Sequence, residues 1–313
     1  MKFIIVAPSF DQNSGGAIVL HKFCSCLSEI GMNAYVTPYP LYYPFRNRII
    51  KNGYVKACLG LIRHKFKAVY GKITYKSAFD NKLFKGSIDE SDIVVYPEII
   101  EENPLKAKNV VRWLLHSPDY FTGRISIGNE DLVVPYNSTV DVSKIKGKFT
   151  ISDNPLTIVH LPLDLYKSGR SRDDERVGAC FLVRKGIGKP FVHDDDAIQI
   201  DDMSHSEVAK VFEKSKVFYS YDPNTLFSRL AVISGCRSLV IPNERVPKDA
   251  WRPVDSALRN GVAYGLDEYN QGIDLLTANK VIDDLREEEN NNFIQCQNFV
   301  DEVIQKFGVP RFE

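Results

Sequence analysis

The opening of the chain alternates between short apolar runs and a helix-like segment, with a glycine-containing loop between them. The first apolar run ends at Ala7, the loop contains Gly15 and Gly16, and residues 17–29 carry apolar side chains at helical spacing. A second apolar run follows at residues 33–37. The order strand, loop, helix, strand is typical of a parallel sheet covered by helices. The opening of the chain therefore predicts an α/β fold.

The same alternation returns after a polar stretch at residues 164–176, which indicates a second domain. We predict two Rossmann-like domains that face a central cleft. The predicted limits are residues 1–165 for the first domain, 166–285 for the second and 286–313 for a closing helix, with the tail from 267 to 307 forming two helices. Further strands are predicted at residues 92–96, 109–115, 131–134, 157–161, 177–183, 197–200, 217–219, 238–241 and 262–264.

Composition limits the classes of function that suit this chain. Its 313 residues allow two cores, and its 40 basic and 40 acidic side chains cancel, so nothing in the net charge favours a nucleic-acid partner. The first apolar run is too short for a signal peptide, and no window is long enough to cross a bilayer. The six cysteines lack CxxC or small-domain spacing and suit reduced thiols. We expect a cytoplasmic protein.

One interval departs from this neutral average. Residues 46–85 contain eleven Lys or Arg and a single acid, Asp80. Apolar side chains within the interval recur at helical spacing, so one interpretation is a helix with a solvated basic side. The other is a patch that meets an anionic membrane surface or a phosphate-bearing acceptor. The second interpretation predicts a peripheral protein at the inner face of the cytoplasmic membrane.

Ligands of open α/β sheets bind beyond the carboxyl ends of the strands, so reactive groups are expected in the loops that follow the strands. The first such loop, residues 11–16, contains Gly15 and Gly16 but lacks the GxGxxG pattern of dinucleotide sites. Glu98 follows another predicted strand, and His116 and Asp119 follow the next. A carboxylate or imidazole at such a position can act as a general base. For Glu98, pairing with Lys106 or Lys108 is the structural alternative, and for His116 the alternative is a structural histidine with its hydrogen bonds satisfied.

The first strand of the second domain is followed directly by Arg184-Lys-Gly-Ile-Gly188. Arg184 and Lys185 suit a diphosphate, because guanidinium binds two oxygens at once and ammonium supplies a compact charge. Polar residues also follow the strand at 217–219: Tyr221, Asp222, Asn224 and Thr225. Asp222 is predicted to cap the next helix, and the loop to hold the phosphate or sugar hydroxyls of a nucleotide.

Two other patterns are less favoured. Residues Asp194, Asp195 and Asp196 match a DxD metal motif, but they precede a predicted strand instead of following one, so a solvated turn is preferred. The histidines and cysteines show no zinc spacing. We therefore expect no metal and no cofactor.

Three stretches resemble the GT-B glycosyltransferases of bacterial surface polysaccharides such as O-antigen and capsule. They are SGGAIVLHKFCSCLSEIG at 14–31, VVYPEIIEENPLKAKNVVRWLLHSPD at 94–119 and FYSYDPNTLFSRLAVISGCRSLVIP at 218–242. The resemblance implies an acceptor-binding first domain, a nucleotide-sugar-binding second domain and metal-independent transfer to a glycan or lipid-linked glycan.

The resemblance also implies roles for individual residues. Arg184 and Lys185 resemble the basic pair at the donor diphosphate, and Tyr221, Asp222 and Thr225 resemble donor contacts. The loop of Ser14, Gly15 and Gly16 resembles the glycine loop that approaches the diphosphate. Glu98 is the first hypothesis for the base, followed by Asp11 and Asp119. The EX7E pattern of many retaining members is missing, so the stereochemical course stays open.

Two functions of other classes remain open. The same fold suits a nucleotide-sugar epimerase, which needs no acceptor, and a transferase-like subunit that binds without catalysis. The basic interval at 46–85 favours the transferase, because an epimerase has no use for a membrane surface.

Overall fold

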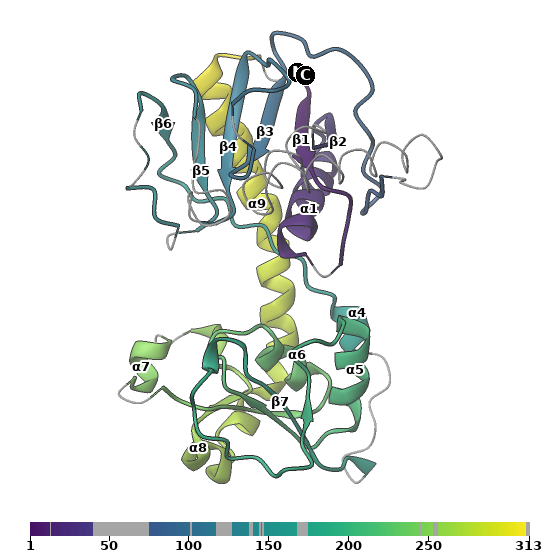
Figure 1. Cartoon of the computed structure of the whole chain (residues 1–313), viewed down its shortest axis with the longest axis vertical. Coiled ribbons are helices and arrows are strands. Elements are labelled where there is room, and N and C mark those ends of the chain that lie inside the picture. The colour runs from purple at the N-terminus through teal and green to yellow at the C-terminus, as the bar shows by residue number, and fades with distance from the viewer. Residues whose placement is uncertain are drawn as a thin grey trace, which may run out of the picture. The chain divides into compact units, whose positions relative to one another are not determined.

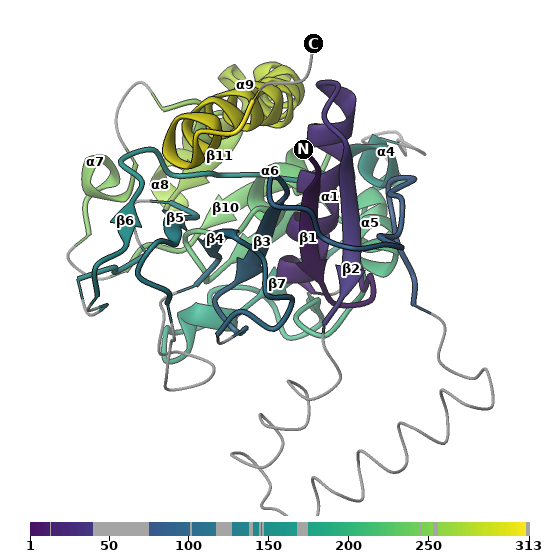
Figure 2. The same cartoon turned by 90° about the horizontal axis from the view of Figure 1, so that it is seen from above.

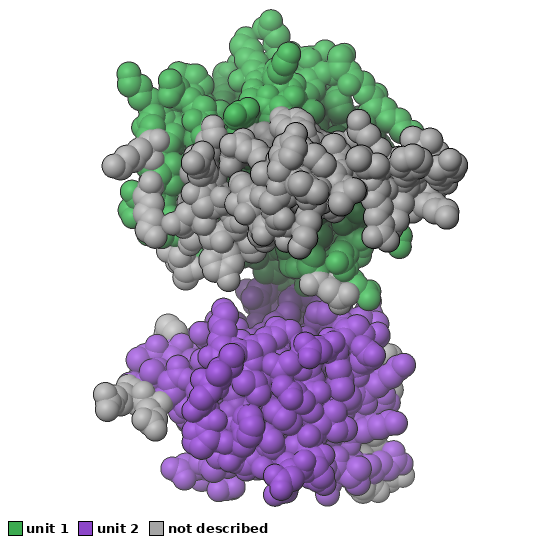
Figure 3. Space-filling view, in the orientation of Figure 1, with its two compact units in different colours: residues 1–160, 289–313 green, residues 161–288 purple. Residues whose placement is uncertain are grey.

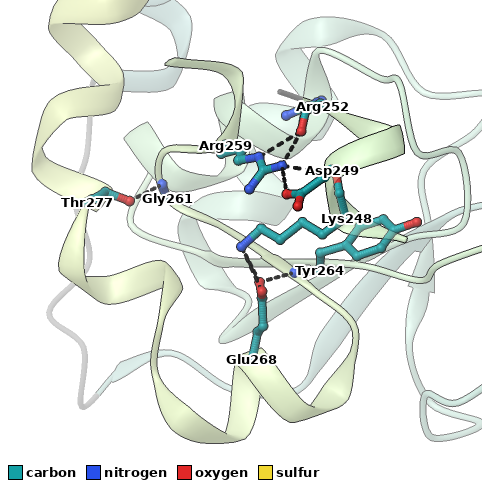
Figure 4. A network of polar contacts seen from close by, with 8 residues as sticks. All are labelled: Lys248, Asp249, Arg252, Arg259, Gly261, Tyr264, Glu268 and Thr277. Carbon is teal, nitrogen blue, oxygen red and sulfur yellow. Dashed lines mark hydrogen bonds and ion pairs between the residues drawn. The ribbon is translucent and has the colours of Figure 1, made fainter. Parts of the chain in front are cut away.

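The computed structural model describes residues 1–12, 14–39, 75–100, 102–116, 127–137, 140–143, 145, 147–167, 175–243, 246–252 and 256–310. The chain forms two compact units, which Figure 3 colours separately. Unit 1 contains Met1–His160 and Glu289–Glu313, and unit 2 contains Leu161–Glu288. The basic interval predicted at 46–85 lies largely outside the described residues, because positions 40–74 are not among them.

Unit 1 is built on a parallel sheet with the strand order β2-β1-β3-β4-β5-β6 (Figure 1). The strands β1, β3 and β5 are apolar and fully buried because both faces of the sheet are covered there. Phe3 and Ile5 pack on one face with α1 and α9, whereas Ile4 and Val6 pack on the other. The elements are β1 (Phe3–Ala7), α1 (Gly15–Glu29), β2 (Ala34–Pro38), β3 (Ile93–Pro97), β4 (Asn109–Leu114), β5 (Leu132–Pro135), β6 (Thr150–Ile151) and α9 (Val281–Phe307).

Unit 2 contains a second parallel sheet with the order β11-β10-β9-β7-β8. The pattern of short apolar strands alternating with helices explains both sheets, and the prediction of two Rossmann-like α/β units is confirmed. The cleft predicted between the units stays a prediction. The elements are α4 (Leu163–Lys167), β7 (Ala179–Leu182), η2 (Arg184–Gly186), β8 (Ile198–Gln199), α5 (His205–Lys214), β9 (Val217–Ser220), α6 (Phe227–Ile233), β10 (Arg237–Val240), α7 (Lys248–Trp251), η3 (Ala257–Arg259), β11 (Val262–Tyr264), α8 (Leu266–Gln271), η4 (Asp274–Leu276) and η5 (Ala278–Lys280).

Two predicted elements differ from the structure. Residues 157–161 are apolar but form no strand, because the backbone N–H and C=O of Val159 bond to the side chain of Asn292 instead of to a neighbouring strand. The tail predicted as two helices contains α8, two short 3₁₀ turns and the single long helix α9. Helix α9 contributes its residues up to Glu288 to unit 2 and those from Glu289 to unit 1. Figure 2 draws it as one coiled ribbon.

Candidate functional site

The strand order of each sheet reverses at one pair of neighbouring strands. In unit 1 the chain moves from β1 to β2 on one side and then returns to β3 on the other side of β1. In unit 2 it moves from β7 to β8 and returns to β9 on the other side of β7. Loops diverge at such a switch point and leave a crevice beyond the carboxyl ends of the strands, which is where α/β sheets bind ligands.

The switch point of unit 2 brings together the two loops that the sequence singled out. Arg184 and Lys185 follow β7, and residues 221–225 follow β9. The two loops touch, because a Cβ atom placed on Gly186 would lie 2.3 Å from the backbone oxygen of Tyr221. Only glycine allows this approach. The basic pair and the polar loop therefore form one local site.

The loop after β7 holds its two cations in an exposed position. Arg184 adopts a left-handed backbone conformation with φ of 36°, and its N–H donates to Oδ1 of Asp201 at 2.8 Å. Its guanidinium carbon lies 5.0 Å from the centre of the Phe227 ring, in cation–π range. Asp201 thus shapes the loop, while the guanidinium is oriented against the helix that follows β9.

The loop after β9 is a polar turn and not the first turn of a helix. The N–H of Asn224 donates to Oδ1 of Asp222 at 3.1 Å, and the N–H of Phe227 donates to Oγ1 of Thr225 at 3.3 Å. Helix α6 begins only at Phe227. The prediction that Asp222 caps this helix is wrong, because Asp and Thr side chains here bond their own backbone two residues on and delay the helix.

Tyr221 is buried beneath the two loops. The side chain is fully buried, and its phenolic oxygen accepts the N–H of Val192 at 2.9 Å. Its ring packs edge-on against Phe181 and Phe191. The phenol is thus already hydrogen-bonded within the aromatic cluster beneath the two loops.

The loop after β7 contains a third cation, Lys189, which the sequence analysis did not predict as a site residue. Its ammonium donates to the backbone oxygen of Ile241, just beyond β10, at 2.5 Å. Burial lowers the pKa of Lys189, and the charge of Asp222 opposes that shift. Lys189 therefore links the loops after β7, β9 and β10. The run Arg184-Lys-Gly-Ile-Gly-Lys189 contained the signal, but no pattern in the sequence reveals a tertiary bond to Ile241.

Glu98 lies at the switch point of unit 1, directly after β3. Its carboxylate is 5% exposed and accepts the N–H of Leu115 at 3.0 Å. Burial raises the pKa of Glu98, while the N–H groups of Leu115 and of Glu98 itself pull it down. The alternative of an ion pair with Lys106 or Lys108 has no support here, since Lys108 pairs with Glu90 at 2.9 Å.

The glycine loop lies at the same switch point. Ser14 caps α1 by accepting the N–H of Ala17 at 3.4 Å. A Cβ atom on Gly16 would lie 3.7 Å from the side chain of Leu115, the residue whose N–H holds Glu98, and one on Gly15 would meet open space. The structure thus gathers Glu98 and the start of α1 around Leu115.

The other candidate bases of unit 1 are His116, Asp11 and Asp119. His116 follows Leu115 and is half-buried, and Asp11 is exposed in the loop after β1. The backbone oxygen of Asp11 accepts the N–H of Ser14 at 3.1 Å. Asp119 lies outside the described residues.

The described part of the chain also bears on metal binding and membrane insertion. Within it, no cluster of three or more His, Cys, Asp or Glu side chains suits a metal ion. Asp194, Asp195 and Asp196 form an exposed turn before β8. No helix among the same residues is long and apolar enough to cross a membrane.

Comparison with known proteins assigns no family to the chain. No family model matches the chain, and no curated protein matches it. Among solved structures, spinosyn rhamnosyltransferase SpnG is similar at 10% sequence identity over 99% of this chain and 97% of that one, with a TM-score of 0.27. A likeness this weak carries no argument about activity, so the functional proposal rests on the site residues.

Proposed function

We propose that this chain is a glycosyltransferase that moves a sugar from a nucleotide-sugar donor to a hydroxyl group of a glycan acceptor. The observation that carries the proposal is the unit 2 switch point, where Arg184 and Lys185 meet the polar loop 221–225 through the contact of Gly186 with Tyr221. A cationic loop beside a turn rich in hydrogen-bonding groups suits the diphosphate and sugar hydroxyls of a nucleotide sugar.

The donor side supplies the charge that the reaction requires. When the glycosyl bond breaks, negative charge builds on the leaving diphosphate, and fixed cations stabilise it. We assign this role to Arg184 and Lys185, with Lys189 holding the loops in place. These cations take the part that a divalent metal has in other transferases, so we propose transfer without a metal or cofactor.

The acceptor side needs a base for the hydroxyl proton, and Glu98 suits this role. A buried carboxylate with a raised pKa is a stronger base than an exposed one, because proton transfer is most efficient when the pKa of the base is near the working pH. Asp11, His116 and Asp119 are kept as alternatives. Ser14, Gly15 and Gly16 are assigned to the donor phosphates.

The finer proposal is a lipid-linked glycan of the bacterial surface as acceptor. Its support is the basic interval 46–85 of the sequence, which suits an anionic membrane surface. We therefore place the protein at the inner face of the cytoplasmic membrane.

The test of the donor site is the thermal midpoint of the full chain in the presence of UDP, GDP, dTDP, CDP, CMP and their common sugar conjugates. A ligand at a hundred times its dissociation constant should stabilise the fold by about 2.7 kcal/mol. We expect one nucleotide class to raise the midpoint by degrees. Arg184→Ala should weaken its binding by about 1.5–3 kcal/mol, the value of a charge-assisted hydrogen bond.

Lys216→Ala is the matched control, because Lys216 is also exposed but precedes β9 and so lies at the opposite edge of the same sheet. It should leave nucleotide binding unchanged. If no nucleotide shifts the midpoint, the transferase proposal fails and a binding subunit becomes the better assignment. If Arg184→Ala binds nucleotide normally, the basic pair has no diphosphate role.

A further inference from the structure

Unit 1 contains a cavity of about 640 Å³ that none of the candidate site residues lines, although its wall residues 79–82 belong to the basic interval 46–85. It lies among α1, the start of β2 and the segment at 79–82. Ala34 lines it and begins β2, whereas Glu98 follows the last residue of the parallel strand β3, so the two lie at opposite edges of the sheet. A five-residue strand spans about 16 Å. The cavity is therefore separate from the candidate site.

The charges around this cavity balance. Lys22 and Lys82 contribute two ammonium groups, and Glu29 and Asp80 contribute two carboxylates. Such a lining favours neither an anion nor a cation, and its many polar groups disfavour a purely apolar ligand. Two aromatic side chains, Tyr35 and Phe79, complete the wall. The volume lies within the range of about 300–1,000 Å³ that is usual for ligand sites.

Two successive wall residues have a strained backbone. Phe79 and Asp80 adopt left-handed conformations with φ of 56° and 54°. For a bulky aromatic residue this conformation is an outlier, and it persists only where the surroundings hold it. The centres of the Phe79 and His160 rings lie 4.8 Å apart in a T-shaped arrangement, and the Lys22 ammonium lies 5.7 Å from the centre of the Phe79 ring. Strain of this kind clusters at ligand sites.

The next residue, Asn81, carries an unsatisfied polar atom. Asn81 is 8% exposed, and its Nδ2 donates to the backbone oxygen of His21 at 2.7 Å. Among the described residues, its buried Oδ1 accepts no hydrogen bond. Buried polar atoms are nearly always paired. Asn81 also lines the cavity, so the wall combines a strained turn with an acceptor that lacks a donor.

We propose that this cavity binds a short neutral oligosaccharide. Sugar hydroxyls both donate and accept, so they match carboxylates, amides and ammonium groups in equal measure, and the apolar faces of sugar rings pack on aromatic side chains. The site lies on the unit to which the acceptor was assigned. We propose that the cavity acts as a second binding site for a growing acceptor glycan, and this role rests on the proposed function.

The test is saturation-transfer difference NMR of the full chain, without any nucleotide, against maltotriose, chitotriose and mannotriose. We expect saturation transfer to at least one of the three. Asp80→Gly removes a wall carboxylate but keeps a residue that adopts positive φ without cost, and it should weaken binding at least tenfold. Lys82→Ala should weaken binding as well. Glu90→Gln is the control, since that carboxylate belongs to the same unit and is exposed outside the cavity.

Absence of saturation transfer from all three sugars overturns the inference, and so does binding that survives both Asp80→Gly and Lys82→Ala. The result is independent of the donor site. A chain that binds a trisaccharide but no nucleotide keeps the cavity assignment and loses the proposed reaction, and the reverse pattern does the opposite.

Discussion

The two units share the order of their first five strands but present opposite chemistry at the point where the strand order reverses. In unit 1 the reversal places a buried carboxylate, Glu98, beside a glycine loop. In unit 2 it places exposed cations, Arg184 and Lys185, beside a polar turn. The parallel sheet fixes where the loops after its strands diverge. The residues of those loops set the charge at that point. The contrast suits a reaction in which one unit accepts a proton and the other stabilises an anion.

The largest expected effect comes from removing the buried charge of unit 1. Glu98→Gln keeps an oxygen that can accept the N–H of Leu115 but cannot take up a proton. If Glu98 is the base, turnover should fall by about 10²–10⁴-fold, the usual contribution of general base catalysis. Nucleotide binding, measured by the midpoint shift, should stay unchanged because Arg184, Lys185 and the loop of Ser14, Gly15 and Gly16 are all left intact. Normal turnover of the variant would remove Glu98 from the mechanism.

The next effect concerns how unit 2 joins its two loops. A Cβ atom at Gly186 would lie 2.3 Å from the backbone oxygen of Tyr221, which cannot swing aside as a side-chain end would. Gly186→Ala should destabilise the fold by about 1–3 kcal/mol, as overpacked sites do, and should weaken nucleotide binding. Gly86→Ala is the control, because a Cβ there meets nothing within 4 Å. Equal thermal midpoints for the two variants would show that the loops do not depend on this contact.

The smallest effect is a pH dependence of stability caused by Glu98. Burial raises its pKa in the folded chain above the ordinary value of 4.5, so the folded state binds the proton more tightly than the unfolded state. Its favourable contribution is present below the ordinary pKa and is lost as pH rises through the folded pKa. Glu98→Gln should therefore be more stable than the parent at neutral pH and equal to it near pH 4.

Denaturant unfolding of both proteins across this range measures the difference. A variant that is less stable at neutral pH would mean that the hydrogen bonds to the carboxylate outweigh its desolvation. The same substitution in an exposed carboxylate, Glu90→Gln, should show no such rise at neutral pH, because Glu90 pairs with Lys108 at the surface.

Both sheets were predictable from sequence because buried parallel strands are short apolar runs bounded by turn residues. Their carboxyl ends could be placed for the same reason, and this is why Arg184, Lys185 and Glu98 were predicted to lie at those ends. The turn at 221–226 was misassigned because Asp222 and Pro223 are equally typical of a helix start and of a turn. Which of the two forms depends on the later bond between Thr225 and Phe227.

Other features depend on contacts between residues far apart in the chain. The Lys189 ammonium donates to the backbone oxygen of Ile241. The N–H of Val159 donates to the side chain of Asn292 instead of to a neighbouring strand. A sequence pattern reports periodicity along the chain and carries no record of such partners. The strained turn at Phe79 and Asp80 was also invisible, because neither residue type signals a left-handed backbone by itself.

Helix α9 adds a constraint on how the chain is made. Unit 1 is interrupted by the whole of unit 2, and the α9 residues Cys296, Phe299, Val300 and Val303 fill the same core as α1. On the ribosome these residues emerge only after unit 2 has been synthesised. Chain synthesis proceeds at about 5–20 residues per second. For that interval α1 covers this face of the first sheet without α9, and we expect the apolar residues that α9 later buries to make this the stage at which the chain needs a chaperone most.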